Sequence, residues 1–247
     1  FGVPLRILLQ TRDRALALGE PLVVVGPGDD PQTGTWVSVF EVLLRGRPCR
    51  FVDGRHAALF PVAPATLVVA PGAEAAAAVY SRFGVIGPSD AILTRLGEEP
   101  FHVARWEGRR ALGLRPIVGP RALANGAELI GYHWTGELRP GGTIEWWIVW
   151  RVWKTPGDPA AIYHIFNHLL DADGKRWVQA DSPTVPTRDW QVDDQVVQAY
   201  RLQIPADALP GPYAMRVGMY SYPALQSQPA LDVAGNPAAD WVTIRLE

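Results

Sequence analysis

The stretch Thr143–Trp153 constrains the fold of this chain most strongly. It reads Thr-Ile-Glu-Trp-Trp-Ile-Val-Trp-Arg-Val-Trp and holds four of the ten tryptophans. In an extended strand, successive side chains point to opposite faces. One face is then wholly apolar and is predicted to lie in the core of a β-sheet: Ile144, Trp146, Ile148, Trp150 and Val152. The other face mixes Glu145 and Arg151 with the indoles of Trp147 and Trp153. That second face is either covered or displays an aromatic surface.

Composition limits the class of protein. Hydrophobic residues make up 48% of the 247 residues and charged residues 19%, which is typical of a folded chain with one large domain or two ordinary ones. The net charge is −2 and neither half carries a basic stripe, so nucleic acid is not an expected partner. The single cysteine, Cys49, excludes an intrachain disulfide framework. Glycine (24) and proline (23) are spread between apolar runs, which favours short strands joined by tight turns.

The first hundred or so residues alternate helix and strand signals. Apolar residues at helical spacing predict helices over 5–18, 35–44 and 72–80. Short apolar or β-branched runs predict strands over 21–26, 50–53, 57–60, 66–70 and 101–106. Strands that alternate with helices indicate an α/β layer with a mainly parallel sheet.

Beyond a connection at 113–126, the hydrophobic period changes to two. Strands are predicted over 128–134, 143–153, 162–170, 176–180, 195–204, 213–220 and 241–246. This spacing is typical of an antiparallel β-sandwich. We therefore expect an α+β chain of two domains: a small α/β (Rossmann-like) layer over residues 1–112 and an antiparallel immunoglobulin-like β-sandwich over residues 117–247.

No cofactor site is predicted. Val25-Gly-Pro-Gly-Asp-Asp30 follows a strand and precedes a helix, where a dinucleotide-binding turn would lie. The third glycine of that motif is missing, Pro27 removes a backbone donor, and Asp29 and Asp30 would repel a pyrophosphate. We interpret the segment as a strand-to-helix turn whose acidic residues cap the helix. A divalent cation held by the aspartate pair is a weaker alternative.

Two other segments resemble metal sites, and neither is predicted to be one. His164 and His168 would share a helix face, but the surrounding pattern is that of a strand, in which they stand about 13 Å apart. We expect them to be polar residues on the outer face of a sheet, beside Phe166. Leu170-Asp-Ala-Asp-Gly-Lys175 resembles the start of a calcium loop, but a hairpin turn explains it.

No catalytic residue is predicted. The chain lacks a Gly-x-Ser-x-Gly elbow, Cys49 has no histidine at a recognisable spacing, and Asp193-Asp194 lies in turn-like sequence. Trp147 and Trp153 are the candidate sugar-binding residues, since indoles stack on the apolar faces of sugar rings. His164 or Trp190 would be their neighbours on such a platform. The alternative is that both indoles pack beneath a loop or against the α/β half.

Several segments carry a resemblance to a known family. They are Val118–Tyr132, Leu138–Thr143, Phe166–Gly174, Gln179–Asp181 and Leu209–Tyr220. Together they resemble the C-terminal β-sandwich of bacterial polytopic membrane glycosyltransferases related to the dolichyl-phosphate-mannose protein mannosyltransferases. The first half, from Leu5 through Phe51–Gly54 to Trp106, resembles the small α/β domain that follows the last membrane helix of that superfamily.

The resemblance implies a parent enzyme that transfers a sugar from a polyprenyl-phosphate donor outside the cytoplasm. The catalytic aspartate of that family lies in an early membrane loop to which no part of this chain corresponds, so no catalytic residue is transferred. The most apolar window, 57–80, is interrupted by prolines and is not a membrane span. A start at Phe1 fits a fragment trimmed after the last span, tethered on the extracytoplasmic side, whose partners are the membrane part of its own parent chain and a glycan or lipid-linked sugar.

Two principal hypotheses follow. The first is a non-catalytic extracytoplasmic region of such a glycosyltransferase, with no transferase activity and no tight nucleotide binding of its own. The second is a carbohydrate- or cell-envelope-binding β-sandwich module without enzymatic activity. A free-standing soluble enzyme that uses the α/β half is a third and weaker reading, because the nucleotide turn fails.

Overall fold

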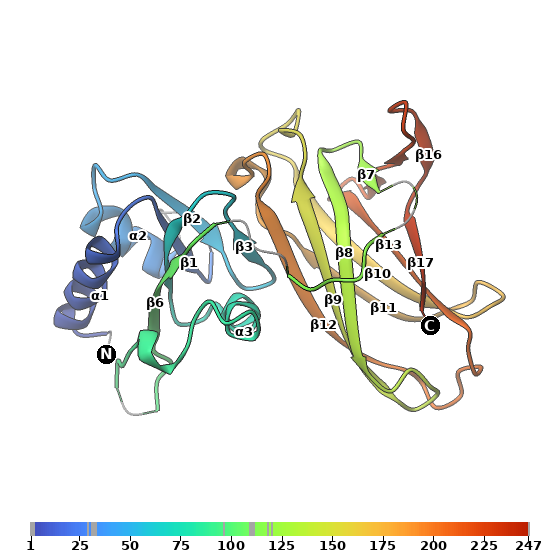
Figure 1. Cartoon of the computed structure of the whole chain (residues 1–247), viewed down its shortest axis with the longest axis horizontal. Coiled ribbons are helices and arrows are strands. Elements are labelled where there is room, and N and C mark those ends of the chain that lie inside the picture. The colour runs from blue at the N-terminus through green and yellow to red at the C-terminus, as the bar shows by residue number, and fades with distance from the viewer. Residues whose placement is uncertain are drawn as a thin grey trace. The chain divides into compact units, whose positions relative to one another are not determined.

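A computed structural model describes residues 3–28, 30, 34–95, 97–108, 112–117, 119 and 121–246. The chain is mostly β and separates into two compact units, Phe1–Leu112 and Gly113–Glu247 (Figure 1). Within the described ranges, no helix has the length and apolarity needed to cross a membrane.

The elements of the first unit alternate between helix and strand. They are α1 (Leu5–Leu18), β1 (Leu22–Gly26), α2 (Thr35–Leu43), β2 (Cys49–Asp53), β3 (Ala58–Phe60), β4 (Ala65–Val69), α3 (Glu74–Arg82), β5 (Ala91–Ile92) and β6 (Phe101–Trp106). Each helix and strand predicted from the sequence is present, with ends within three residues of the expected ones. The two-residue strand β5 was not predicted, because so short a run shows no periodicity.

The sheet of the first unit has the strand order β2-β1-β4-β6-β5. Strands β2, β1 and β4 are parallel, whereas β6 is antiparallel to both β4 and β5. The expectation of a mainly parallel sheet is therefore correct only for the β2-β1-β4 part. The physical reason is the path after β4. After β4 the chain passes through α3 to β5, which is parallel to β4 but does not pair with it. The chain then reverses direction, and β6 lies between β4 and β5 and pairs with both.

Helices cover the sheet of the first unit. Helix α1 contributes Ile7 and Leu8 and helix α2 contributes Phe40 to a core that includes Val24 and Val68 of the sheet. A second cluster surrounds Phe60, whose ring meets Tyr80 of α3 and Trp106 of β6 edge to face. Both predicted amphipathic faces, of α1 and α2, are thus confirmed as core faces.

The second unit consists almost entirely of strands. They are β7 (Ala122–Leu123), β8 (Ala127–Gly136), β9 (Thr143–Val152), β10 (Ile162–Leu170), β11 (Arg176–Pro183), β12 (Gln195–Gln203), β13 (Tyr213–Tyr222), β14 (Gln226–Ser227), β15 (Ala230–Leu231), β16 (Pro237–Ala239) and β17 (Val242–Leu246). The switch to a period of two correctly predicted the long strands. The short strands β7, β14, β15 and β16 were not predicted.

The strands of the second unit form two antiparallel sheets. In one, the order is β16-β15-β7-β8-β9-β12, with β9 between β8 and β12. In the other, the order is β11-β10-β13-β14, and β17 also pairs with β13. Figure 1 shows β8, β9 and β12 side by side, with β10, β11 and β13 in a second layer.

The inner faces of these two sheets share one core. Trp146 of β9 donates its indole N–H to the side-chain oxygen of Asn167 on β10, at 2.8 Å, so the hydrogen bond joins the two layers. Met215 and Met219 of β13 and Leu169 of β10 are fully buried. Since inward and outward residues alternate, this core fixes which side chains of β10, β11 and β13 face outward.

Candidate functional site

Strand β9 has the predicted inner face. Trp146 and Trp150 are 0% and 1% exposed, which confirms the expectation that both are core residues. Trp146 also stacks with Tyr132 of β8, with the ring centroids 5.4 Å apart.

Trp147 and Trp153, the candidate sugar-binding residues, differ in exposure. Trp147 in the middle of β9 is 8% exposed, whereas Trp153, just after the strand, is 37% exposed. Six residues of extended chain place them roughly 20 Å apart, which is too far for one sugar ring to touch both. They therefore cannot stack on the same sugar ring. A sugar-binding role for either indole stays a prediction.

The two histidines lie on the outer face of β10, as expected. His164 stacks on Tyr222 with ring centroids 4.7 Å apart, and His168 lies 5.0 Å from the ring of Phe166. In the part of the chain that the structure describes, no group of three or more metal-ligating side chains is present.

The segment that resembles a calcium loop is the turn of the β10–β11 hairpin. The Asp171 carboxylate accepts hydrogen bonds from the backbone N–H groups of Asp173 and Lys175 and from the Trp177 indole. Desolvation opposes ionisation of Asp171, but these hydrogen bonds outweigh it and lower the pKa of the carboxyl group. The carboxylate is therefore used within its own hairpin.

The β1–α2 connection is described only in part, since Asp29 and residues 31–33 lie outside the described residues. Helix α2 has Gly34 as its N-cap residue, with no side-chain hydrogen bond at that position. The Gly34 N–H donates to the backbone carbonyl of Asp30 at 2.7 Å. The expected capping of α2 by an acidic side chain is thus not seen at the N-cap, because a glycine occupies that position.

The first unit also has a hollow of about 260 Å³ beyond the end of β4. Ligands of open α/β sheets bind at the carboxyl ends of the strands, where this hollow lies. Its lining includes two carboxylates, Glu74 and Glu99, together with His102. Such a lining opposes phosphate groups. The absence of tight nucleotide binding stays a prediction.

Cys49, Asp193 and Asp194 are the other residues considered for catalysis. Burial raises the pKa of the Cys49 thiol to about 12, so the reactive thiolate is scarce at neutral pH. Asp194 is fully buried and accepts a hydrogen bond from the backbone of Gln191 at 3.2 Å, and Asp193 lies 3.5 Å from Arg151.

A groove of about 490 Å³ lies on the outer face of the β11-β10-β13 sheet. We call it the outer-face groove. Its lining combines aromatic rings with planar polar side chains: Phe166, His168, Arg176, Gln179, Asp181, Arg216, Tyr220, Leu225, Ser227 and Trp241. The strand register explains why they converge. Phe166 pairs with Asp181 on one side and with Gly218 on the other, while His168 pairs with Gln179 and Arg216.

Gly218 makes room for the floor of this groove. A Cβ atom at Gly218 would lie 2.5 Å from Cζ of Phe166, closer than any side chain tolerates. The Phe166 ring therefore lies across the backbone of β13. It also faces Tyr220 in a stacked arrangement, with centroids 6.4 Å apart.

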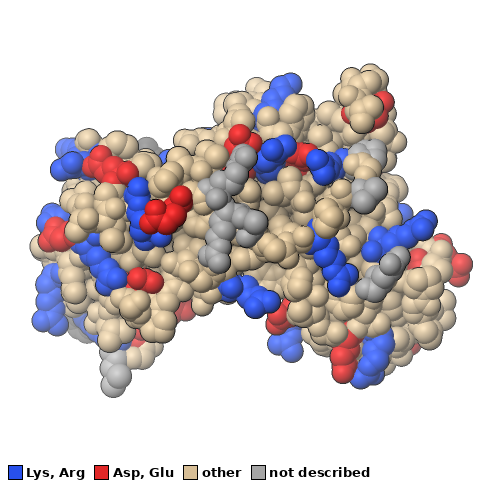
Figure 2. Space-filling model, viewed as in Figure 1, with Lys and Arg blue, Asp and Glu red and all other residues tan. Residues whose placement is uncertain are grey.

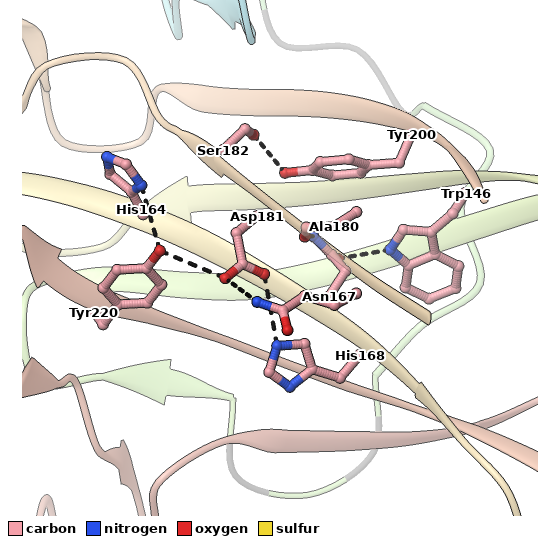
Figure 3. A network of polar contacts seen from close by, with 10 residues as sticks. Trp146, His164, Asn167, His168, Ala180, Asp181, Ser182, Tyr200 and Tyr220 are labelled. Atoms are coloured by element: carbon pink, nitrogen blue, oxygen red, sulfur yellow. Dashed lines mark hydrogen bonds and ion pairs between the residues drawn. The ribbon is translucent and has the colours of Figure 1, made fainter. Parts of the chain in front are cut away.

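A polar network surrounds the Asp181 carboxylate, as Figure 3 shows. Gln179 donates its side-chain N–H to Asp181 at 2.8 Å, and the Tyr220 hydroxyl donates to the same carboxylate oxygen at 3.4 Å. Nε2 of His168 lies 3.5 Å from the other oxygen. Burial lowers the pKa of His168; Asp181 opposes that shift, whereas Arg176 and Arg216 reinforce it. His168 is therefore mostly neutral at pH 7.

Arg216 is fixed against an indole at the side of the groove. Its guanidinium carbon lies 3.9 Å from the centroid of Trp241, in the range of a cation–π contact. Nε of Arg216 is buried and has no hydrogen-bond acceptor among the described residues. Arg176, at the start of β11, is the second arginine of the lining.

Sequence reasoning placed His164, Phe166 and His168 on an outer sheet face but did not find the groove. Two of its residues, Arg216 and Trp241, are 25 positions apart in the sequence, and no local pattern relates them. The sequence did contain one signal that could have indicated the groove. His164, Phe166 and His168 occupy the outward positions of β10, and Arg216, Tyr220 and Tyr222 occupy the outward positions of β13.

Comparison with known proteins found a structural similarity but no matching family. No protein-family model and no curated protein sequence matches the chain. Among solved structures, the chain is similar to the C-terminal domain of Wzt, at 15% sequence identity and a TM-score of 0.33. The match covers 55% of this chain and 81% of that one. The expected resemblance to the mannosyltransferase-related family gains no support from these comparisons.

Proposed function

We propose that the second unit is a carbohydrate-binding module and that the outer-face groove is its binding site. The observation that supports this most is the composition of the groove. Aromatic rings (Phe166, Tyr220 and Trp241) lie beside side chains that donate and accept hydrogen bonds in a plane (Gln179, Asp181 and Arg216). Sugars present apolar C–H faces for stacking and neighbouring hydroxyl groups that pair with such side chains.

Charges of both signs are mixed on one face of the molecule. On the face shown in Figure 2, basic and acidic residues are interspersed, and neither sign forms a continuous stripe. The described lining of the groove includes one carboxylate, Asp181, whereas the common glycosidase mechanisms use two. The proposal is therefore binding and not hydrolysis.

The proposal also includes a more specific fold for each unit. We retain a Rossmann-like character for the first unit and an immunoglobulin-like sandwich for the second. We also retain the hypothesis of a membrane-tethered, extracytoplasmic position in a glycosyltransferase that uses a polyprenyl-phosphate sugar, where the groove would hold glycan near the membrane. The upstream gene sequence tests that context, since several hydrophobic spans before Phe1 would support it and their absence would oppose it.

Binding to a panel of immobilised glycans tests the proposed function. We expect at least one glycan to bind the wild-type chain, and Gln179→Ala to weaken that binding about 5- to 10-fold through the loss of a hydrogen bond. Trp153→Ala is the matched control, because Trp153 lies outside the groove lining. Equal binding by Gln179→Ala and wild type, with a loss in Trp153→Ala, would move the site to the β9 face.

A further inference from the structure

Two arginines in the lining of the outer-face groove indicate what class of sugar the groove binds. Arg216 and Arg176 both line the groove, and neither forms an ion pair with any described carboxylate within 4.0 Å. Elsewhere in the unit, Arg121 and Arg151 both pair with Glu128. The groove arginines are thus left without an anionic partner in the described part of the chain.

Asp181, the one carboxylate of the described lining, forms no ion pair with these arginines. Asp181 is engaged by Gln179, Tyr220 and His168 instead. Arg216, in turn, is fixed by its contact with the Trp241 ring, and its Nε is a buried donor without an acceptor among the described residues.

Both arginines line the same groove and lie near His168. Arg176 on β11 and Arg216 on β13 each disfavour the protonated form of His168, which stands between them on β10. Two positive charges that line one groove, without an ion-pair partner among the described carboxylates, match a ligand that carries a negative charge.

We propose that the outer-face groove binds an acidic glycan, with the anionic substituent of a sugar held by Arg216 and assisted by Arg176. A carboxylate of a uronic acid fits the planar fork of a guanidinium group, which donates two parallel hydrogen bonds to it. The sugar ring then lies against the aromatic part of the lining. This inference rests on the proposed carbohydrate binding and specifies its ligand class.

Calorimetry with matched ligands tests this assignment. The ligands are an oligouronate, the same oligosaccharide after reduction of its carboxyl groups, and a sugar phosphate of similar length. We expect the oligouronate to bind at least 10-fold more tightly than its reduced form, with an advantage that shrinks as salt is raised. Preference for the sugar phosphate would keep the anionic assignment but replace the carboxylate with a phosphate group.

Variants of the two arginines locate the anionic group. Arg216→Gln should weaken oligouronate binding 10- to 100-fold, the range expected for a charge-assisted hydrogen bond, and should weaken binding of the reduced form much less. Arg176→Gln should weaken oligouronate binding less than Arg216→Gln does. Because Arg176 is exposed, its replacement should leave the fold intact, so a loss of binding in this variant is not a folding defect. Arg201→Gln on β12, in the other sheet, is the control for net charge.

The outcomes separate the two proposals. Equal affinity for the acidic and reduced oligosaccharides, with no loss in either arginine variant, overturns the acidic-glycan inference but keeps the carbohydrate-binding function. Lack of binding to any glycan of either kind overturns both.

Discussion

At the scale of single residues, the two core indoles of β9 have equal burial but different hydrogen bonding. Trp146 donates to Asn167 at 2.8 Å, whereas Nε1 of Trp150 has no acceptor among the described residues. A buried polar group that loses its partner costs about 1–3 kcal/mol, whereas a group without a partner costs nothing further on removal. The pair therefore separates the effect of the hydrogen bond from that of ring size.

We expect Trp146→Phe to destabilise the second unit by about 1–3 kcal/mol more than Trp150→Phe does. The comparison uses urea unfolding monitored by circular dichroism. Replacement of Trp146 by alanine should cost more, about 3–5 kcal/mol, because it also leaves a cavity. Equal losses in the two phenylalanine variants would show that the Trp146–Asn167 bond adds no stability.

Gly218 is the second single residue with a testable role, because its lack of a side chain leaves space for the Phe166 ring. Gly218→Ala places a Cβ atom 2.5 Å from Cζ of Phe166, so the ring must move. We expect a loss of about 1–3 kcal/mol in stability, typical of overpacking, together with weaker glycan binding. Gly157→Ala is the control, because nothing lies within 4 Å of a Cβ atom at that position. An unchanged melting temperature in Gly218→Ala would contradict this role, because the Phe166 ring would then move aside without loss of stability.

At the scale of elements, the sequence predicted the long strands well because each has one buried face. In β9 and β10, alternation alone identified the inner residues, and it also placed His164 and His168 outside. It did not identify the neighbours of those strands, since pairing depends on the whole core and not on local pattern. The convergence of Asp181, Arg216 and Trp241 was therefore beyond sequence reasoning. The antiparallel direction of β6 was missed for a similar reason, because it depends on the unpredicted strand β5.

The β10–β11 hairpin depends on one carboxylate. The pKa of Asp171 is lowered in the folded chain, because its carboxylate accepts hydrogen bonds within the hairpin. The hydrogen bonds therefore stabilise the hairpin fully at pH values above 3.8, the ordinary pKa of the group. This stabilisation is lost as the pH falls through the pKa of the folded chain. We expect Asp171→Ala to lower the melting temperature at pH 7 and to change it less at pH 3. Asp173→Ala, which alters an exposed side chain in the same turn, is the control. A difference between Asp171→Ala and wild type that is the same at both pH values would contradict this account.

At the scale of the whole molecule, two histidines make stability depend on pH. Burial lowers the pKa of His102 in the first unit and of His168 in the second below the ordinary value of 6.5. The unfolded chain then binds protons at a higher pH than the folded chain. Stability is therefore fully present above about pH 6.5 and falls as the pH drops below that value.

We expect chemical unfolding at pH 7.5, 6.5 and 5.5 to show this decline, with a smaller decline in His168→Gln. His56→Gln replaces an exposed histidine and serves as the control. Stability that rises from pH 7.5 to pH 5.5, or a slope that His168→Gln leaves unchanged, would contradict the assignment.

Carbohydrate binding by the second unit in the outer-face groove can be followed residue by residue. Nuclear magnetic resonance titration of the ¹⁵N-labelled chain with a glycan ligand tests it most directly, because each backbone amide reports its own surroundings. We expect the largest shift changes at residues of β10, β11 and β13 that line the groove, centred on Phe166, Asp181 and Tyr220, with little change at Trp153. Shift changes centred on Trp147 and Trp153, with none in the groove, would contradict the claim.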